Sequence, residues 1–332
     1  MLSVVLETLA VVLPAGVFPV LCVALCVGLA WMAVRRTLNW VARSWKVRTS
    51  GRTGLVTGCD SGFGLLAAQQ LERMGFDVIA ACLTDDGVRT VTGKATRRGG
   101  ITGTKLNVMS SASIGELAAF VEKQCPDGLF GLVNNAGIIE FGPADWTTMA
   151  SYRRVADVNL FGLIEVTKAL LPALMRARGR VVNIASVAGF LSAPALSAYS
   201  VSKFGVEAFS DSLRLEMNAW DVGVCIVEPG FFATPLTSAK TLLAHMDRVW
   251  ESVDDEKRAR YGERMKKTFA KVLVHGLSTF CDKRPQKVSD AVCEALSSRL
   301  PRERYLVGTD ANYLWWFLVR IPTPVLDFFL VR

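Results

Sequence analysis

Short apolar runs alternate through most of the chain with stretches whose apolar residues recur at helical spacing. The run at 54–57 predicts a buried strand, and the periodic stretch at 65–71 predicts the helix that follows it. A second strand is predicted at 77–82, and the apolar runs that end near residues 134 and 228 predict two more. This alternation indicates a single doubly wound α/β domain built around a parallel sheet.

The first fifty residues follow a different pattern. No charged residue occurs between Leu9 and Val34, a stretch long enough to cross a bilayer. Because Pro14 and Pro19 interrupt its early part, the spanning helix is expected at 17–34. The basic residues that come next, with no acidic residue among them, are Arg35, Arg36, Arg43, Lys46, Arg48 and Arg52. We therefore predict a membrane anchor with a basic juxtamembrane segment at residues 1–50.

Charge and composition agree with that anchor. The formal net charge is +8, and the basic segment supplies most of it, which indicates a membrane surface and not nucleic acid as the partner. A cleaved signal peptide would carry its positive charges before the apolar run. Positive charge after the span predicts that the rest of the chain lies on the cytosolic side. The 8 cysteines have neither disulfide nor zinc spacing, so reduced thiols and no metal site are expected.

A tyrosine and a lysine one helical turn apart are the candidate catalytic groups. Tyr199 and Lys203 share a helix face, and Ser186 lies upstream of them. A nearby positive charge favours the phenolate, so we expect Lys203 to lower the pKa of Tyr199 from its usual value of about 10. The pair is then suited to exchange the proton of an alcohol/carbonyl couple, with Ser186 holding the substrate oxygen.

A glycine-rich turn joins the first predicted strand to the first predicted helix. Glycines let the backbone approach a pyrophosphate closely, and the start of the helix presents N–H groups to the phosphates. This arrangement predicts a dinucleotide site in a Rossmann-type sheet. The residues of the turn expected to contact the dinucleotide are Gly58, Asp60, Ser61, Gly62, Phe63 and Gly64.

Three other motifs occur near predicted strand ends. The segment 134–137 (Asn-Asn-Ala-Gly) ends an apolar strand, and small or amide-bearing residues there suit the crevice in which α/β sheets bind ligands. Asn159 lies inside a predicted helix at 155–167. The run 227–230 ends in a proline and a glycine, and Thr234 follows shortly after.

Taken together, these motifs resemble the short-chain dehydrogenase/reductase family over about residues 52–310. Segments 57–64, 80–84, 131–137 and 204–214 are similar to the corresponding motifs of the retinol and hydroxysteroid dehydrogenases. The D-β-hydroxybutyrate dehydrogenases share most of these motifs. The resemblance implies an enzyme that uses NAD(P) to interconvert an alcohol and a carbonyl.

The resemblance also implies a role for each matching residue. Tyr199 would be the general acid/base, and Lys203 would hold the nicotinamide ribose. Ser186 would orient the substrate oxygen, so Ser186 and Tyr199 are the expected substrate contacts. Asn159 would support a proton-relaying water, and Thr234 would fix the nicotinamide carboxamide. The other implied cofactor-binding residues are Asn107, Asn135, Ala136, Gly137, Tyr199, Lys203, Pro229 and Gly230.

Two positions depart from the common family pattern. Asn107 stands where many members have an aspartate near the adenine, although its amide oxygen can still accept a hydrogen bond. Cys82 aligns with the aspartate that usually holds the adenosine ribose. No arginine or lysine follows the second strand before Arg89, and Asp60 adds negative charge to the glycine turn. Because a 2′-phosphate calls for a basic side chain here, we expect NAD in preference to NADP.

The last hundred residues suggest how a substrate is bound. Residues 231–285 carry apolar positions at helical spacing and then a charged run, which predicts a substrate lid with a solvated outer face. Residues 311–332 are apolar and aromatic but include prolines and charges, so we expect membrane-interface contact, or packing over a groove or dimer contact, instead of a span. The domains predicted are thus the anchor 1–50, the dehydrogenase domain 51–310 and the tail 311–332.

The expected function is NAD-dependent, reversible oxidation of an alcohol on a lipophilic substrate, a hydroxysteroid or retinol. One alternative is a D-β-hydroxybutyrate dehydrogenase at the mitochondrial inner membrane, with Arg248 or Lys240 as the anchor for the acid. An alternative of another class is an inactive membrane-tethered binding protein, which the complete set of catalytic residues argues against. The resemblance implies a homo-oligomer at the endoplasmic reticulum membrane, with its catalytic domain in the cytosol.

Overall fold

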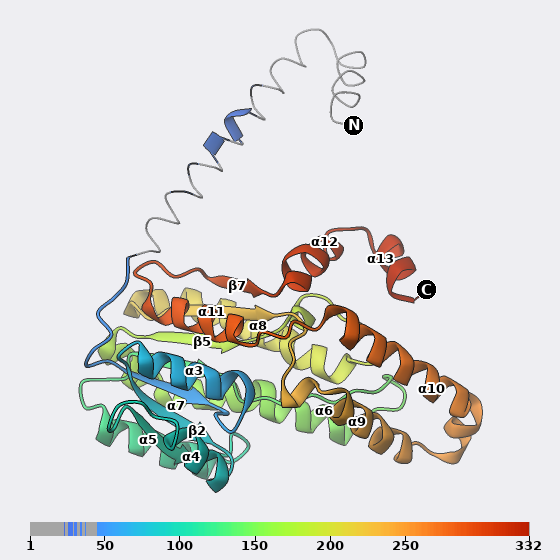
Figure 1. Cartoon of the computed structure of the whole chain (residues 1–332), viewed down its shortest axis with the longest axis horizontal. Coiled ribbons are helices and arrows are strands. Elements are labelled where there is room, and N and C mark those ends of the chain that lie inside the picture. Colours follow the sequence, from blue (N-terminus) through green and yellow to red (C-terminus); the bar gives the residue numbers. More distant parts are fainter. Residues whose placement is uncertain are drawn as a thin grey trace. The chain divides into compact units, whose positions relative to one another are not determined.

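The computed structural model describes residues 45–331, together with positions 23, 26–28, 30, 31, 34 and 37. One sheet has the strand order β3-β2-β1-β4-β5-β6-β7, and all neighbouring strands are parallel (Figure 1). The predicted doubly wound, Rossmann-type sheet is confirmed. The strands are β1 (Thr53–Thr57), β2 (Asp77–Cys82), β3 (Ile101–Lys105), β4 (Gly131–Asn134), β5 (Arg180–Ile184), β6 (Gly223–Pro229) and β7 (Arg304–Val307).

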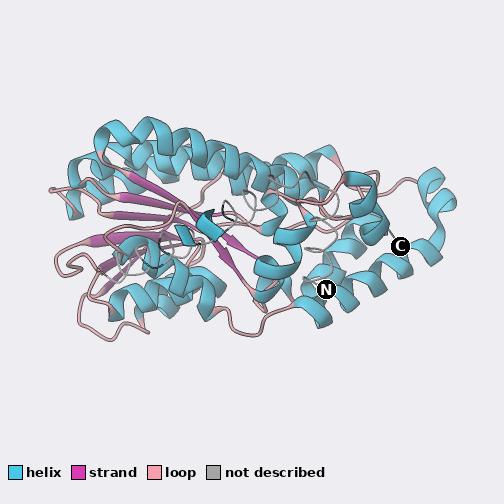
Figure 2. Cartoon of the chain, turned by 90° about the horizontal axis from the view of Figure 1, so that it is seen from above, coloured by secondary structure: helices cyan, strands magenta, loops and turns pink. Residues whose placement is uncertain are grey.

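Helices connect the strands and lie on both faces of the sheet (Figure 2). A π-helix at Asp157–Phe161 joins α6 to α7, a second at Asp310–Trp315 precedes α12, and a 3-10 turn at Val187–Gly189 follows β5. The α-helices are α3 (Gly62–Arg73), α4 (Asp85–Thr92), α5 (Ser111–Gln124), α6 (Met149–Ala156), α7 (Gly162–Ala177), α8 (Ser197–Met217), α9 (Ala239–Glu251), α10 (Asp255–Phe280), α11 (Gln286–Ser297), α12 (Trp316–Leu318) and α13 (Thr323–Val331).

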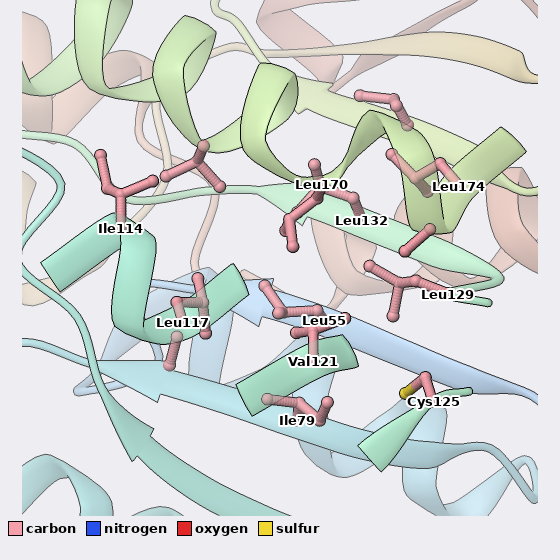
Figure 3. Packing of buried hydrophobic residues seen from close by; sticks show 14 of the residues in the cluster. Leu55, Ile79, Ile114, Leu117, Val121, Cys125, Leu129, Leu132, Leu170 and Leu174 are labelled. Carbon is pink, nitrogen blue, oxygen red and sulfur yellow. The ribbon is translucent and has the colours of Figure 1, made fainter. Parts of the chain in front are cut away.

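The main core fills the space between the sheet and helices α5, α7 and α8. Leu55 and Leu132, on neighbouring central strands, pack against Leu117 of α5 and Leu170 of α7 (Figure 3). All four side chains are essentially fully buried. Burying an aliphatic side chain of this size contributes roughly 1.5–3 kcal/mol, so this layer holds the central strands, and with them their carboxyl ends, in fixed positions.

The opposite face of the sheet is covered by α3 and α11, which pack against each other. Leu71 of α3 and Val288 and Leu296 of α11 are fully buried there. Polar bonds also join the two helices, because Ser289 donates its hydroxyl to the side-chain oxygen of Gln70 at 2.6 Å. Since α3 begins at the glycine turn, this packing fixes the direction in which its N-terminus points.

The segment predicted as a lid is largely helical, as its apolar spacing indicated. Leu242 and Met246 of α9 pack with Ile139 and Leu196, which belong to loops beside the carboxyl ends of the strands. The charged run lies in α10, which bends at Gly262, a residue with a φ of +67°. The apolar side of α9 therefore faces the site, while α10 carries most of the exposed charge.

The predicted spanning helix at 17–34 lies for the most part outside the described residues. The positions that are described between 23 and 37 are all helical. Within the described part of the chain, one helical stretch, Met149–Ala177, is long and apolar enough to cross a membrane. Because Val166, Leu170 and Leu174 of this stretch are buried in the main core, it is a core helix of the α/β domain.

Candidate active site

Six strands, β1 to β6, end at one crevice. The strand order reverses between β1 and β4, and open α/β sheets bind ligands at the carboxyl ends of strands at such a point. A cleft of about 480 Å³ lies there, lined by residues at or just after the carboxyl ends of β1 to β6. The site is therefore built by loops whose positions the sheet determines.

The glycine turn is shaped by close contact with the segment after β4. Gly58 has a φ of +69°, and a Cβ there would lie 2.8 Å from the Cα of Ala136. A Cβ on Gly64 would overlap the carbonyl oxygen of Gly58. Asn135 braces the turn, because its Nδ2 donates to the carbonyl oxygens of Thr57 at 2.9 Å and Gly58 at 3.1 Å. Only glycine fits at these two positions.

The N-terminus of α3 opens into the cleft. Gly62 and Phe63 begin this helix and line the cleft wall. Ser61 occupies the capping position, but its side chain makes no capping hydrogen bond. Uncapped N–H groups and the positive end of the helix dipole favour an anionic group such as a phosphate. The turn therefore fits the pyrophosphate of a dinucleotide.

Helix α8 presents Tyr199 and Lys203 to the same cleft. The Nζ of Lys203 lies 5.7 Å from the centre of the Tyr199 ring and donates to the carbonyl oxygen of Ile184 at 2.7 Å. Ser186 begins the turn after β5, and its hydroxyl lies 3.4 Å from the carbonyl oxygen of Pro229. The structure thus brings Ser186, Tyr199 and Lys203 together, as their spacing predicted.

The predicted direction of the tyrosine pKa is wrong for this geometry. Burial raises the pKa of Tyr199 to about 12, and hydrogen bonding with Ser186 opposes the rise only in part. Burial lowers the pKa of Lys203 to about 8, against the charge of Glu207, which raises it. Burial disfavours the charged phenolate, and this loss of solvation outweighs the hydrogen bond with Ser186. At neutral pH Tyr199 is therefore a protonated phenol, ready to donate.

Asn159 lies behind the cleft wall, within the π-helix that joins α6 to α7. Such bulges are frequent at functional sites. Its Nδ2 donates to the carbonyl oxygen of Ile138 at 2.9 Å and to the hydroxyl of Ser202 at 3.0 Å. Ser202 in turn donates to the carbonyl oxygen of Tyr199 at 2.7 Å. Asn159 thus ties the loop after β4 to the first turns of α8.

Most residues singled out from the sequence line the cleft. Gly64 and Asn159 do not line the cleft. Each lies behind the residues that form the cleft wall, Gly64 against Gly58 and Asn159 against Ile138. The predicted residues that line the cleft are Gly58, Asp60, Ser61, Gly62, Phe63, Asn107, Asn135, Ala136, Gly137, Ser186, Tyr199, Lys203, Pro229, Gly230 and Thr234.

Asp60 places a carboxylate at the end of β2. In this region Cys82 aligns with the aspartate that usually holds the adenosine ribose in the family. The carboxylate of Asp60 accepts hydrogen bonds from the N–H groups of Leu83 at 2.9 Å and Thr84 at 3.0 Å, and from the hydroxyl of Thr84 at 2.7 Å. Cys82 itself is fully buried. In Rossmann folds, an acidic side chain in this region binds the ribose of NAD. The glycine turn therefore places an acidic side chain at the end of β2, a strand that itself ends in Cys82.

A second cavity of about 60 Å³ shares Ser186 and Tyr199 with the cleft. Among the described residues, no charged side chain lines it. No sequence motif marks the apolar part of its wall, which consists of Ile139, Val187, Ala188, Leu191, Ala193, Leu196, Phe231 and Trp315. Trp315 comes from the C-terminal tail, so this part of the tail packs over the cavity.

Asp310 holds the two aromatic side chains of this cavity in place. Its Oδ2 accepts from the backbone N–H of Phe231 at 2.8 Å and from Nε1 of Trp315 at 3.1 Å. Burial raises the pKa of its carboxyl group, and the N–H of Phe231 opposes the rise. Asp310 is enclosed tightly, since a Cβ on Gly230 would overlap its carboxylate. Nothing in the local sequence pattern marks this residue.

Comparisons with known proteins agree with this geometry. The family profile described as short chain dehydrogenase matches residues 52–242. Retinol dehydrogenase 5 of Mus musculus is 43% identical over 274 residues, which cover 82% of this chain and 85% of that protein. Short-chain dehydrogenase/reductase family 9C member 7 of Mus musculus is 41% identical over 279 residues, covering 83% and 88%.

Solved structures share the fold. A short chain dehydrogenase/reductase from Burkholderia phymatum in complex with NAD has a TM-score of 0.68 at 21% identity, over 86% of this chain and 97% of that one. An actinorhodin polyketide ketoreductase with NADPH has a TM-score of 0.65 at 28% identity, over 79% and 97%. Because both cofactors occur with this fold, the choice between them depends on local residues.

Proposed function

We propose that this chain, which belongs to the short-chain dehydrogenase family, interconverts an alcohol and a carbonyl on a lipophilic substrate, a retinol or a hydroxysteroid, with NAD as its cofactor. The observation that carries the proposal is that Ser186 and Tyr199 line both the cleft and the apolar cavity beside it. A substrate in the cavity would therefore present its oxygen to these two hydroxyls at the edge of the cofactor site.

Each residue of the site has one task in this reaction. The nicotinamide cofactor, when bound in the cleft, supplies the hydride chemistry. Ser186 orients the substrate oxygen, and Tyr199 donates its proton to that oxygen during carbonyl reduction and accepts it during alcohol oxidation. The charge of Lys203 favours the phenolate that forms when Tyr199 has given up its proton. Asn159 keeps the start of α8 in place through Ser202.

Asp60 supports NAD in preference to NADP. Its carboxylate lies at the end of β2, where a 2′-phosphate would meet its negative charge. Two basic side chains of this region, Arg89 and Lys105, are paired with Asp86 and Asp85, respectively. Their positive charge is thereby partly neutralised. The negative charge of Asp60 is then the main influence on the choice between NAD and NADP.

The apolar cavity supports a lipophilic alcohol over a small acid. A substrate such as 3-hydroxybutyrate would need a cation for its carboxylate. Among the described residues, Lys203 is the one cationic side chain that lines either cavity, whereas Lys240 and Arg248 line neither. The aromatic and aliphatic wall instead suits hydrocarbon, and at about 60 Å³ the cavity holds the part of a retinol or a steroid next to the reacting oxygen.

Exposed apolar side chains support attachment to a membrane. In the N-terminal segment, Val23, Val27, Trp31 and Val34 each expose half or more of their surface. In the tail, Trp316, Phe317, Val325 and Phe328 are likewise exposed. We assign residues 1–50 as an anchor and residues 311–332 as a tail with an interfacial contact, and we place the enzyme on the cytosolic side of the endoplasmic reticulum membrane.

An apolar surface on the helices beside the site suits a homo-oligomer. Phe161, Val201 and Phe204 are exposed by 57%, 59% and 44%, and they belong to the π-helix before α7 and to α8. Association through these residues would cover apolar surface and stabilise the helix that carries Tyr199.

A substrate panel tests the proposed function. The full chain in detergent or lipid is incubated with NAD and either retinol, several hydroxysteroids or 3-hydroxybutyrate, and NADH formation is followed by absorbance. We expect turnover of at least one retinol or hydroxysteroid and none of 3-hydroxybutyrate. Turnover of the small acid alone would reverse the assignment, and turnover of no alcohol with NAD or NADP would favour a binding protein.

A further inference from the structure

Glu207 lies one helical turn beyond Lys203 and two turns beyond Tyr199 on α8. Residues four apart share a helix face, so the three side chains form one row. Glu207 is only 8% exposed. A Cβ on Gly189 would lie 3.0 Å from both the Cγ of Glu207 and the carbonyl oxygen of Lys203. Glu207 therefore packs against the short turn that begins at Ser186.

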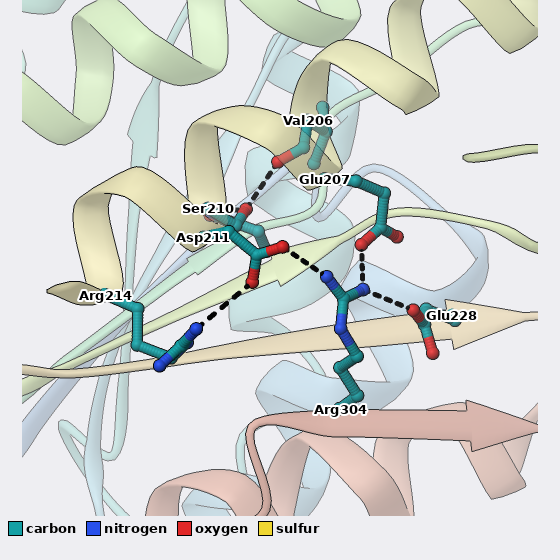
Figure 4. A network of polar contacts seen from close by, with 8 residues as sticks. Val206, Glu207, Ser210, Asp211, Arg214, Glu228 and Arg304 are labelled. Atoms are coloured by element: carbon teal, nitrogen blue, oxygen red, sulfur yellow. Dashed lines mark hydrogen bonds and ion pairs between the residues drawn. The ribbon is translucent and has the colours of Figure 1, made fainter. Parts of the chain in front are cut away.

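One guanidinium holds Glu207 in place. Arg304 of β7 donates through Nη1 to Glu207 and, at 2.7 Å, to Glu228 of β6, and through Nη2 to Asp211 at 2.6 Å (Figure 4). The other oxygen of Glu207, Oε1, is buried and has no hydrogen-bond partner among the described residues. A buried carboxylate with one unsatisfied oxygen costs free energy, so Arg304 is needed to hold Glu207 in this position.

The cluster contains more carboxylates than guanidiniums. Glu207, Asp211 and Glu228 face Arg304, and Arg214 pairs with Asp211 at 3.5 Å. The next cation along α8 is Lys203, whose ammonium donates to a neutral carbonyl oxygen in the cleft wall. The negative charge left over by the cluster therefore lies next to the lysine of the catalytic set.

We propose that Glu207 is a positioning residue for the reaction, and that its carboxylate, held by Arg304, keeps the ammonium of Lys203 charged at and above neutral pH. The inference rests on the proposed function, because it assigns Glu207 a task through Lys203. Glu207 itself does not line the cleft.

The order of the titrations fits this task. Burial and the charge of Glu228 raise the pKa of Glu207 to about 7. Burial lowers the pKa of Lys203 to about 8, and the charge of Glu207 opposes that fall. As the pH rises, Glu207 therefore ionises before Lys203 loses its proton. Tyr199 on α8, Asp211 on α8, Glu228 on β6 and Arg304 on β7 are the other titratable groups that face this pair.

The pH dependence of carbonyl reduction tests the inference. In this direction Tyr199 must be protonated, and with a pKa of about 12 it stays so through the alkaline range. A loss of activity well below that pH therefore reports the neutralisation of Lys203, whose pKa is about 8. Glu207→Gln keeps the shape of the side chain but removes its charge. In this variant we expect the midpoint of the alkaline limb, in which kcat/KM falls, to occur about half a pH unit or more below that of the wild type. Glu207→Asp, which keeps the charge, should restore the limb to within about a quarter of that shift.

The controls separate charge from packing and from the proposed function. Glu216→Gln removes the same charge from an exposed position of α8 and should leave the limb unchanged. An unchanged limb in Glu207→Gln, or equal shifts in Glu207→Gln and Glu207→Asp, would overturn the inference. If Glu207→Gln does not fold, Glu228→Gln provides the test. Loss of the Glu228 charge makes Glu207 easier to ionise, so the pH at which kcat/KM falls on the alkaline side should stay the same or rise. A lower pH would contradict the role of Glu207. Full activity of Tyr199→Phe would instead reject the proposed function.

Discussion

At the scale of single residues, the site depends on carboxylates placed by backbone N–H groups. Asp60 accepts from the N–H groups of Leu83 and Thr84, and Asp310 accepts from that of Phe231. Each carboxylate joins two segments that are far apart in the sequence. Because these bonds define where the negative charge lies, one substitution at either position should change the selectivity of the site more than its fold.

Replacing Asp60 with Ala should relax the choice of cofactor. Without the carboxylate at the end of β2, a 2′-phosphate loses a repelling charge, and NAD loses a ribose partner. We expect the ratio of kcat/KM for NAD to that for NADP to fall about tenfold or more, which corresponds to about 1.4 kcal/mol. Asp127→Ala, an exposed position just before β4, removes the same charge from the other end of the sheet and should leave the ratio unchanged.

The buried position of Glu207 also predicts a pH dependence of stability. Its folded-state pKa is raised from 4.5 to about 7, so its stabilising contribution is full below pH 4.5 and is lost as the pH rises toward 7. Glu207→Gln is neutral at every pH and lacks this loss. The melting temperature of the variant, relative to the wild type, should therefore increase between pH 5 and pH 7.5, by an amount equivalent to roughly 2 kcal/mol. A difference that stays constant with pH would contradict the assignment.

At the scale of elements, apolar periodicity and glycine positions predicted the strands, helices and turns that short-range interactions determine. The strand, glycine turn and helix of β1 and α3 follow from apolar periodicity and from glycines, and their place in the chain was correct. The wall of the apolar cavity was not predictable, because Trp315 reaches Phe231 and Leu191 only through the packing of β7 beside β6. Asp60 was noted as a negative charge, but its bonds to the end of β2 depend on how two loops meet.

The π-helix at Asp310–Trp315 should control substrate binding. Asp310→Ala removes the acceptor for Phe231 and Trp315, and each buried donor left unpaired costs about 1–3 kcal/mol. We expect KM for the lipophilic alcohol to rise about tenfold while KM for NAD stays within about twofold of the wild type. Asp327→Ala, in an exposed position of α13, is the control. Equal increases in both KM values would show that Asp310 supports the whole crevice and not the cavity wall.

At the scale of the whole molecule, the sheet delivers a cofactor cleft and an apolar cavity to one pair of hydroxyls, those of Ser186 and Tyr199. The loops that follow β1 to β6 line the cleft, and Trp315, which lies after β7, completes the apolar cavity. A lipophilic substrate reaches such a cavity most readily from a lipid phase, and apolar side chains are exposed both in the N-terminal segment and in the tail.

The topology relative to the membrane can be tested on the full chain. The anchor at 1–50 predicts that the protein stays with membranes during alkaline carbonate extraction. Basic residues after the span predict that protease added to intact microsomes digests the catalytic domain without detergent. Release by carbonate would contradict the anchor, and protection from protease until detergent is added would contradict the cytosolic orientation.

The most direct test of the account is the rate of NADH formation by Tyr199→Phe beside Tyr313→Phe. Both variants lose a phenol hydroxyl, but Tyr199 lines both cavities, whereas Tyr313 is 77% exposed. With the best alcohol from the panel, we predict that kcat of Tyr199→Phe falls on the order of a hundredfold or more while that of Tyr313→Phe is unchanged. Wild-type turnover by Tyr199→Phe would contradict proton transfer through this phenol.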